Sequence, residues 1–421
     1  MTSSVLAEPL GTPEPEPPAR DLSPRAWVRA NLASTPLNAA LTVVIGIAAG
    51  WAVYRLLRWV FVTADWTVVR VNLRLFMVGF YPGDELWRLW VASFVLVAAL
   101  AVTAGALTAV VAPTAPEGAD QGWWRRAAGI VHRFWPALLG VAAILSFTRT
   151  VLPTVGVVGL VAVAVVGRLA GARIPGRLRP WTWVLVVAGF VVALQVVIGG
   201  GRGTGWDDWG GLHLVVAATV AGIVLAFPLG LVLALGRRST LPAIRIVTVG
   251  YVEAFRAVPL VTLLFLGQYM IGFMFPNTID PPSFLVRAVI AITLFEAAYI
   301  AEIVRGGLQA VPRGQIEAAQ AIGLSPVKVM RLVVLPQALR AVIPAMVGQF
   351  ISLFKDTSLL AIVGFFELLD VARAATQQDA FRGAGLRPLA LAFVGLIYWA
   401  GCSTMSRESR RLERRLGVGE R

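Results

Sequence analysis

The chain has 421 residues, of which 57% are hydrophobic and only 14% are charged, and its formal net charge is +14. A mean hydropathy of +0.76, with apolar runs of about eighteen residues or more, indicates a polytopic membrane protein and excludes a soluble globular one. The basic residues lie between apolar runs, where they predict membrane topology rather than nucleic-acid binding, and the single Cys402 excludes an internal disulfide.

The first half of the chain is predicted to contain a tail and an N-terminal transmembrane module. Residues 1–36 are rich in Pro and Glu and have no apolar run before a cleavage site, so we expect a disordered cytoplasmic tail. The module covers 37–198, with about five spans expected at 37–62, 89–112, 134–152, 155–170 and 180–198. Within 134–170, two spans and a re-entrant hairpin both fit, because Arg149 and Pro153 interrupt the apolar run.

Two further segments of this half are polar. Residues 63–88 are amphiphilic and are expected at the outer interface of the membrane. The Gly-rich residues 199–211 are not a phosphate-binding loop, because no Gly-Lys-Ser/Thr follows the glycines. We expect a flexible extracytoplasmic linker there, marking the boundary between the two halves.

The second half, residues 212–405, is predicted to hold five spans. These are expected at about 212–235, 246–274, 285–304, 342–365 and 388–403. Arg237 and Arg238 follow the first of them, and a basic tail at 406–421 follows the last, so both positions are expected in the cytoplasm. The predicted fold is therefore all-α, with about ten spans and both termini cytoplasmic.

A polar stretch at 305–345 separates the third and fourth spans of this half. Good helix formers fill about 313–322, and Gly323 can adopt the left-handed conformation that ends a helix. The stretch is therefore predicted to turn sharply at Gly323.

A second short helix is expected directly after this turn. Ser325 can cap it, and Pro326 suits its first position, where a missing N–H costs nothing. We expect this helix to stop near Leu335 and Pro336, because proline disfavours helical geometry in the residue before it. The stretch thus predicts a helix-turn-helix elbow between two spans.

The residue spacing in this elbow resembles the cytoplasmic coupling loop of ABC importer permeases. The positions that carry the resemblance are Glu317, Ala318, Ala319, Gly323, Leu335 and Pro336. The family commonly has Ile where Val333 stands here. In that family the loop docks into a cleft of the ATPase subunit and transmits its closure to the membrane helices. The resemblance implies an ATPase-coupling role for these six residues and a dimer of ABC ATPase subunits as partner. We expect no ATP site and no other cofactor in this chain.

Further stretches narrow the resemblance to the amino acid branch of that family. They are 255–260 (FRAVPL, with Ala257 where Gly is commoner), 298–307 (AYIAEIVRGG) and 354–359 (FKDTSL). The long N-terminal half, with 69–76 (VRVNLRLF), resembles the long permeases of general L-amino acid importers. This implies a type I permease core, a paralogous second permease subunit forming a heterodimer, and a periplasmic amino acid binding protein.

Charged side chains inside predicted spans mark a candidate substrate path. Each costs about 2.5–3.5 kcal/mol at the membrane centre, so it is expected to face a partner or a water-filled path. Our hypothesis is that five residues of the third and fourth core spans meet the zwitterionic ends of an amino acid. They are Glu296, Tyr299, Lys355, Asp356 and Thr357. The alternative is an internal ion pair between helices. For Glu253 and Arg256 on the second core span, a pair with each other and a functional role are equally open alternatives.

The sequence thus predicts a permease subunit of an ABC importer for L-amino acids in a bacterial inner membrane. Neither His132 nor His213 has a metal-ligand partner at helical spacing, so we expect no metal site and no enzyme activity. A permease for one narrower solute, such as a single polar amino acid or an opine, remains the first alternative. A secondary amino acid transporter, which would need no ATPase, is the alternative of a different class.

Overall fold

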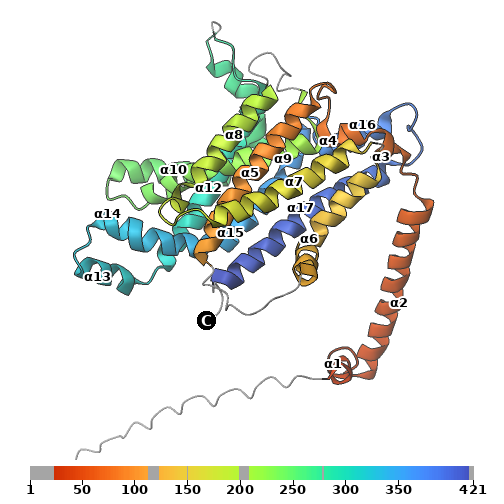
Figure 1. Cartoon of the computed structure of the whole chain (residues 1–421), viewed down its shortest axis with the longest axis horizontal. Coiled ribbons are helices and arrows are strands. Elements are labelled where there is room, and N and C mark those ends of the chain that lie inside the picture. Colours follow the sequence, from red (N-terminus) through yellow and green to blue (C-terminus); the bar gives the residue numbers. More distant parts are fainter. Residues whose placement is uncertain (1–22, 112–122, 149, 199–207, 277–278, 417–421) are drawn as a thin grey trace, which may run out of the picture. The chain divides into compact units, whose positions relative to one another are not determined.

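The computed structural model describes residues 23–111, 123–148, 150–198, 208–276 and 279–416 (Figure 1). Over these residues the named elements are all helices, which confirms the all-α prediction. The chain divides into two compact units, Met1–Asp65 and Trp66–Arg421. The helices before and after the Gly-rich linker therefore belong to one unit, and the division falls earlier in the chain.

The first unit contains α1 (Pro24–Asn31), α2 (Pro36–Arg58) and the π-helical turn η1 (Trp59–Thr63). The Oγ atom of Ser23 accepts a hydrogen bond from the backbone N–H of Ala26 at 3.4 Å and caps α1. This part of the predicted disordered tail is therefore helical, and residues 1–22 lie outside the described residues. Helix α2 is long and apolar enough to cross a membrane, and none of its side chains is buried.

The N-terminal part of the second unit packs around α5. Its helices are α3 (Thr67–Val71), α4 (Leu73–Val78), α5 (Leu86–Val111), α6 (Trp123–Ser146), α7 (Leu152–Ala172) and α8 (Trp183–Ile198). Helix α5 packs against α7 and α8, while α6 packs on the last helix, α17 (Arg387–Leu416). For residues 134–170, two spans and a re-entrant hairpin were both compatible with the sequence. The structure has two separate long helices there rather than a short hairpin.

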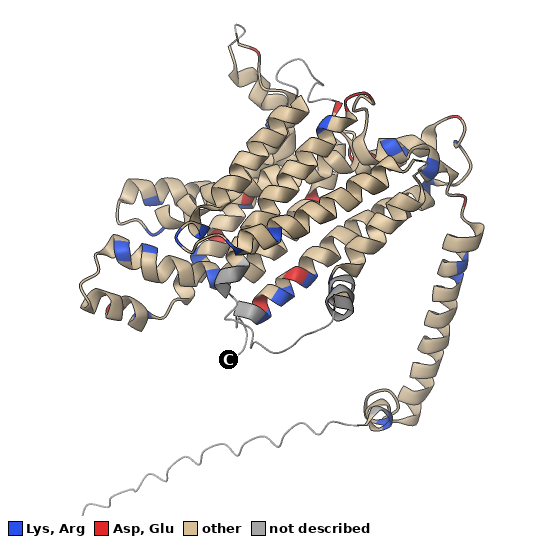
Figure 2. Cartoon of the chain, viewed as in Figure 1, with Lys and Arg blue, Asp and Glu red and all other residues tan. Residues whose placement is uncertain are grey.

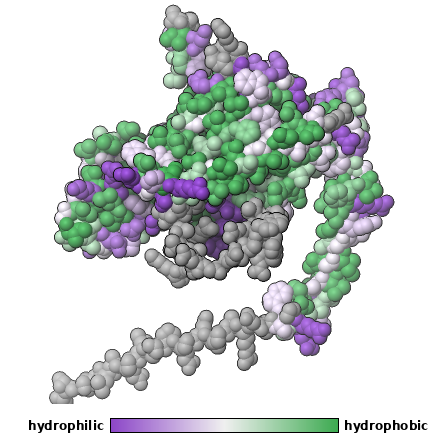
Figure 3. Space-filling view, in the orientation of Figure 1, coloured by the Kyte–Doolittle hydropathy of each residue, from purple (hydrophilic) through white to green (hydrophobic). Residues whose placement is uncertain are grey.

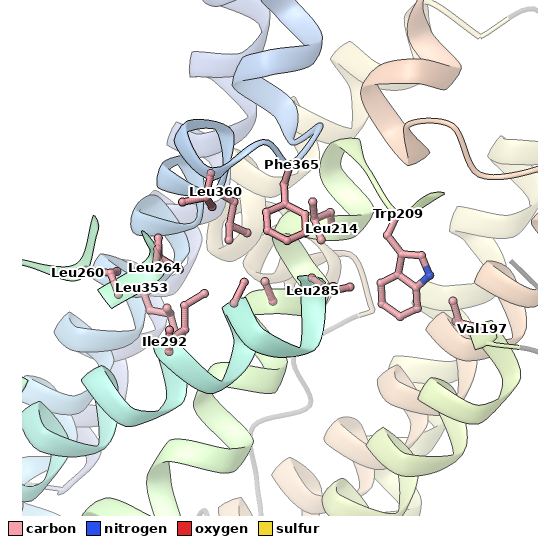
Figure 4. Packing of buried hydrophobic residues seen from close by; sticks show 14 of the residues in the cluster. Val197, Trp209, Leu214, Leu260, Leu264, Leu285, Ile292, Leu353, Leu360 and Phe365 are labelled. Atoms are coloured by element: carbon pink, nitrogen blue, oxygen red, sulfur yellow. The ribbon is translucent and has the colours of Figure 1, made fainter. Parts of the chain in front are cut away.

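The core of the second unit is built on α12 (Phe284–Ala310), which contacts α9 (Gly211–Gly236) most extensively. The other core helices are α10 (Pro242–Ala257), α11 (Leu260–Phe265), α15 (Leu335–Asp356) and α16 (Leu368–Gln377). Figure 4 shows part of the buried cluster they form, including Leu214, Leu285, Ile292, Leu353 and Leu360.

The predicted single span at 246–274 is not one straight helix, because the chain bends by 103° between α10 and the helices that follow. Pro259 explains the bend. Proline excludes helical geometry from the residue before it, and Val258 is extended, with φ −102° and ψ 134°.

In the part of the chain that the structure describes, eight helices are long and apolar enough to cross a membrane, or nine if the bent pair is one span. Helix α6, with 24 residues, is not among them. It is long enough to span, which makes the predicted number of about ten consistent with the structure. In Figure 3 the visible face over α5 and α7 is hydrophobic, and hydrophilic residues gather toward the helix ends.

Three glycines form a tight backbone crossing at the end of the core where α4 meets α9. Gly211 has φ +56°, and its N–H donates to the carbonyl of Phe366 at 2.9 Å. A Cβ atom on Gly210 would lie 2.7 Å from the Phe366 oxygen, and one on Gly79 would lie 2.5 Å from the Gly210 Cα. The described end of the predicted flexible linker, residues 208–211, is therefore fixed by packing.

The carboxyl group of Glu367 adjoins this crossing. Its Oε1 atom accepts hydrogen bonds from the N–H groups of Leu369 (2.8 Å) and Asp370 (3.0 Å) and so caps α16, while the Tyr398 hydroxyl donates to Oε2 at 3.3 Å. Glu367 is completely buried, and burial raises its pKa to about 7.

Replacing Gly211 by Ala should destabilise the second unit. The new Cβ would lie 2.4 Å from the Phe76 carbonyl oxygen, at a φ that only glycine adopts freely. Overpacking costs about 1–3 kcal/mol, so we expect a clear fall in the melting temperature of the detergent-solubilised protein. The control is Gly250→Ala, because nothing lies within 4 Å of a Cβ there. If the Gly211→Ala protein had the same melting temperature as the Gly250→Ala control, the crossing would not require glycine at position 211.

Candidate coupling elbow and substrate path

The elbow consists of α13 (Arg313–Ala321) and α14 (Pro326–Val329). Gly323 has φ +80°, as its predicted role requires. Its N–H donates to the Gln320 carbonyl at 2.9 Å, and the Leu324 N–H donates to the Ala319 carbonyl at 3.2 Å. These two bonds close the end of α13, so the left-handed turn predicted from the sequence is present.

The second half of the elbow differs from the prediction. Ser325 precedes α14, but its side chain makes no capping hydrogen bond. The helix also does not stop near Leu335 and Pro336, because the π-helical turn η7 (Met330–Val334) leads directly into α15. Pro336 lies in the first turn of α15, where its missing N–H removes no bond.

The elbow has one buried face and one exposed face. Ala319, Val329 and Val334 are buried in a cluster with the core helices. On the exposed face three large apolar side chains point away from the protein: Ile322, Val327 and Leu332 are 78%, 75% and 61% exposed. The sequence analysis missed these three residues, although bulky apolar side chains in a polar loop are a signal for a partner surface.

The six predicted coupling residues divide between these faces. Glu317, Ala318, Gly323 and Pro336 are exposed, Leu335 is half-buried, and Ala319 is buried. Ala319 therefore holds the elbow on the core, while Glu317, Ala318, Gly323 and Pro336 are accessible to a partner.

A network of charges centred on Glu302 joins three core helices near the elbow. Arg237, at the end of α9, donates to Glu302 at 2.9 Å and to Glu253 of α10 at 3.0 Å. Arg305 also binds Glu302, and Arg256 lies 3.9 Å from it. Glu253 and Arg256 do not pair with each other. Arg237, from another helix, binds Glu253, and Arg256 lies nearer to Glu302.

Figure 2 shows that several basic residues lie along the ribbon at the end of the second unit that carries the elbow. Arg238 reinforces this end, donating to the Leu308 carbonyl at 3.3 Å. Helices α9, α10 and α12 are therefore linked electrostatically where the elbow begins.

The candidate path residues are only partly brought together. Glu296 is completely buried and accepts hydrogen bonds from the amide of Gln349 at 3.1 and 3.3 Å. Asp356 is close enough to interact electrostatically with Glu296. Sequence reasoning missed Gln349, because its contact with Glu296 arises only when α15 packs on α12.

The other members of the predicted set are placed differently. Tyr299 stacks near Phe295 and lies under the Arg256 guanidinium, 5.5 Å from it, so it belongs to the charge network. The Thr357 hydroxyl is buried and donates to the Phe354 carbonyl at 2.7 Å. Lys355 is exposed. The sequence predicted it in the middle of a span, whereas it lies at the end of α15.

Comparisons with known proteins agree with the helical core. Residues 226–418 match the family described as binding-protein-dependent transport system inner membrane component. The chain is 35% identical to the glutamate/glutamine/aspartate/asparagine transport system permease protein BztC of Rhodobacter capsulatus, covering 99% of this chain and 98% of that protein. It is 34% identical to the inner membrane amino-acid ABC transporter permease protein YhdY of Escherichia coli, covering 100% and 99%.

A shorter relative matches about half of the chain. The probable glutamine ABC transporter permease protein GlnP of Bacillus subtilis is 35% identical over 49% of this chain and 91% of its own length. The two full-length relatives, by contrast, share the entire arrangement. The chain therefore belongs to the binding-protein-dependent transport system inner membrane components, and within them to the long permease subunits of amino acid ABC transporters.

Proposed function

We propose that the chain carries L-amino acids into the cell by alternating access, driven by a dimer of separate ABC ATPase subunits that dock on the elbow. The observation that carries this proposal is the two-faced elbow itself. Its buried face is packed on the core, and its exposed face presents Ile322, Val327 and Leu332. A partner that covers this face would move α12 and α15 together, because the elbow is continuous with both helices.

The remaining partners are a paralogous permease subunit, forming a heterodimer, and a periplasmic amino acid binding protein. The exposed Lys355 supports a second permease subunit, since an ammonium facing lipid costs about 2.5–3.5 kcal/mol at the membrane centre. We assign the protein to the bacterial inner membrane, with the elbow and both termini in the cytoplasm. The basic residues around the elbow support this orientation.

We propose that no residue of this chain binds ATP and that it needs no cofactor. Among the residues that the structure describes, no group of three His, Cys, Asp or Glu side chains could hold a metal ion. The energy for transport then comes from the partner ATPase.

A narrower substrate range is the second candidate. The Rhodobacter capsulatus relative is named for the transport of glutamate, glutamine, aspartate and asparagine. If this chain shares them, basic and large neutral amino acids would not compete for uptake.

Uptake of labelled glutamate in cells lacking the gene, with and without complementation, tests both candidates. If the chain carries L-amino acids in general, acidic, basic and neutral L-amino acids should all compete with the labelled glutamate, and vanadate should inhibit uptake. Competition by acidic amino acids and their amides alone would establish the narrower permease. Uptake that resists vanadate would indicate a secondary transporter, and no complementation-dependent uptake of any amino acid would refute the proposal.

A further inference from the structure

A large cavity lies within the second unit, between the N-terminal helices and the core. Its volume is about 670 Å³, and α4, α5, α6, α7 and α9 contribute to its walls. The cavity exists because α6 and α7 pack in different directions, α6 mainly on α17 and α7 mainly on α5 (Figure 1). The two consecutive helices therefore leave space between them that neither fills.

The walls of this cavity are mostly apolar, with His213 of α9 as one polar lining residue. Most of the lining is aliphatic or aromatic, including Leu89, Trp90, Ile144, Val157 and Leu160. The Ser93 hydroxyl on the α5 wall is already bonded to the Leu89 carbonyl at 2.7 Å. Such a cavity offers water few hydrogen-bond partners and favours a hydrocarbon occupant.

One rim of the cavity is basic and polar. Arg70 and Arg74, one turn apart on α3 and α4, line it with Thr148 and Thr150. Phe147, beside these threonines, lies 5.5 Å from the Trp66 ring at the start of α3, so the four polar residues share one end. Arg74 donates to the Tyr81 carbonyl at 2.7 Å. Neither arginine forms an ion pair with a described acidic residue.

We propose that this cavity is a binding site for an anionic phospholipid, with its phosphate on Arg70 and Arg74 and an acyl chain between α6 and α7. Guanidinium groups bind phosphate oxygens through paired, charge-assisted hydrogen bonds. Basic pockets between transmembrane helices are known to suit lipid head groups. The polar rim matches the head group of a phospholipid, and the apolar depth matches its acyl chain. A fully polar or a fully apolar ligand would match only one of these two parts of the cavity.

Charge argues against the main alternative occupant, the unpartnered helix α2. That helix carries Arg55 and Arg58 in its last turn and no acidic residue, so it cannot neutralise the basic rim. A phospholipid with a net negative head group supplies the missing charge.

The basic rim lies at the end of the core opposite the elbow, which fixes its position along the membrane normal. Asn72, between α3 and α4, exchanges hydrogen bonds with Gln378 after α16, at the end of the core opposite the elbow. With the elbow in the cytoplasm, the lipid belongs to the outer leaflet. This leaflet assignment rests on the proposed function, but the site itself does not.

The first test measures bound lipid. The intact transporter is reconstituted into nanodiscs containing equal amounts of phosphatidylglycerol and phosphatidylethanolamine, released, and analysed by native mass spectrometry. We expect phosphatidylglycerol to be retained preferentially, and retention to fall at least about tenfold in the double variant Arg70→Gln/Arg74→Gln, as expected for loss of charged hydrogen bonds. The control Arg382→Gln/Arg387→Gln removes two exposed arginines near the same end and should retain lipid normally.

A second pair of variants tests the cavity while both arginines stay in place. Val157→Trp fills the space and should also lose the lipid. Val158→Trp adds the same bulk at the neighbouring position, where the side chain is 63% exposed. This variant should retain the lipid. Equal retention of the two lipids, or retention unchanged by both the arginine and the Val157 variants, would overturn the proposal.

A photoreactive benzophenone side chain at Val157 identifies the occupant directly. Illumination of the transporter in its membrane should give an adduct with the mass of an anionic phospholipid. An adduct with a peptide from 36–58 would show that α2 fills the cavity, and an adduct with another subunit would show a protein interface. Either result, or the absence of any adduct, would overturn the lipid assignment.

Discussion

The Gly323→Val variant should reach the membrane in normal amounts but fail to couple ATP hydrolysis to transport. At φ +80° a β-branched residue is strained by about 1–2 kcal/mol. Nothing lies within 4 Å of a Cβ at this position, so the strain comes from the backbone alone and core packing is unaffected. A penalty of this size changes the population of the native turn by about 5–30-fold. We expect uptake, and ATPase stimulation by substrate-loaded binding protein, to fall by a similar factor.

The matched control for this prediction is Gly314→Val in the first turn of α13. Gly314 is also free of neighbours within 4 Å, but its φ is not positive, so valine fits there without backbone strain. The two variants place the same side chain in the same elbow. If Gly323→Val transported like Gly314→Val, the left-handed turn would have no part in coupling.

Removing either charge at the end of α15 should abolish most transport. Among the described residues, neither Lys355 nor Asp356 forms an ion pair within 4 Å with a residue of another helix. The Lys355 side chain is exposed and available to a carboxylate, while Asp356 is half-buried near Glu296. Losing one charged hydrogen bond costs about 1.5–3 kcal/mol, so uptake in Lys355→Ala and in Asp356→Ala should fall about 10–100-fold.

Charge-conserving and remote variants separate this role from a structural one. Lys355→Arg keeps the cation and should retain more uptake than Lys355→Ala, at equal membrane abundance. Arg382→Ala removes an exposed cation far from α15 in the sequence and should transport normally. Wild-type uptake in both alanine variants would remove these residues from the path.

Features that depend on local sequence could be predicted. The spans followed from apolar runs, because a membrane helix needs about 20 apolar residues wherever it packs. The turn at Gly323 followed from a glycine at the end of a run of helix formers. Errors arose where one residue allows two local outcomes. Pro336 was expected to end a helix, but proline is equally suited to begin one, and a π-helical turn supplied that beginning.

Contacts between distant helices could not be predicted from spacing. Glu253 and Arg256 are three residues apart, a spacing that allows them to pair, yet Arg237 reaches Glu253 from a different helix. Gln349 became part of the candidate path only through its contact with Glu296. The lipid cavity is invisible in the sequence for the same reason, since it is created by the different packing directions of α6 and α7.

The contacts near the glycine crossing also bear on the order in which the protein assembles. Asn72 binds Gln378, which lies 306 positions further along the chain, and Gly211 binds the carbonyl of Phe366. During synthesis α4 and the start of α9 emerge long before these partners exist. The N-terminal helices are therefore inserted before Phe76 can pack against its ring partner Phe393 in the last helix of the core. A chain cut short before Phe366 would lack both of these contacts, so the N-terminal helices reach their final packing only in the finished permease.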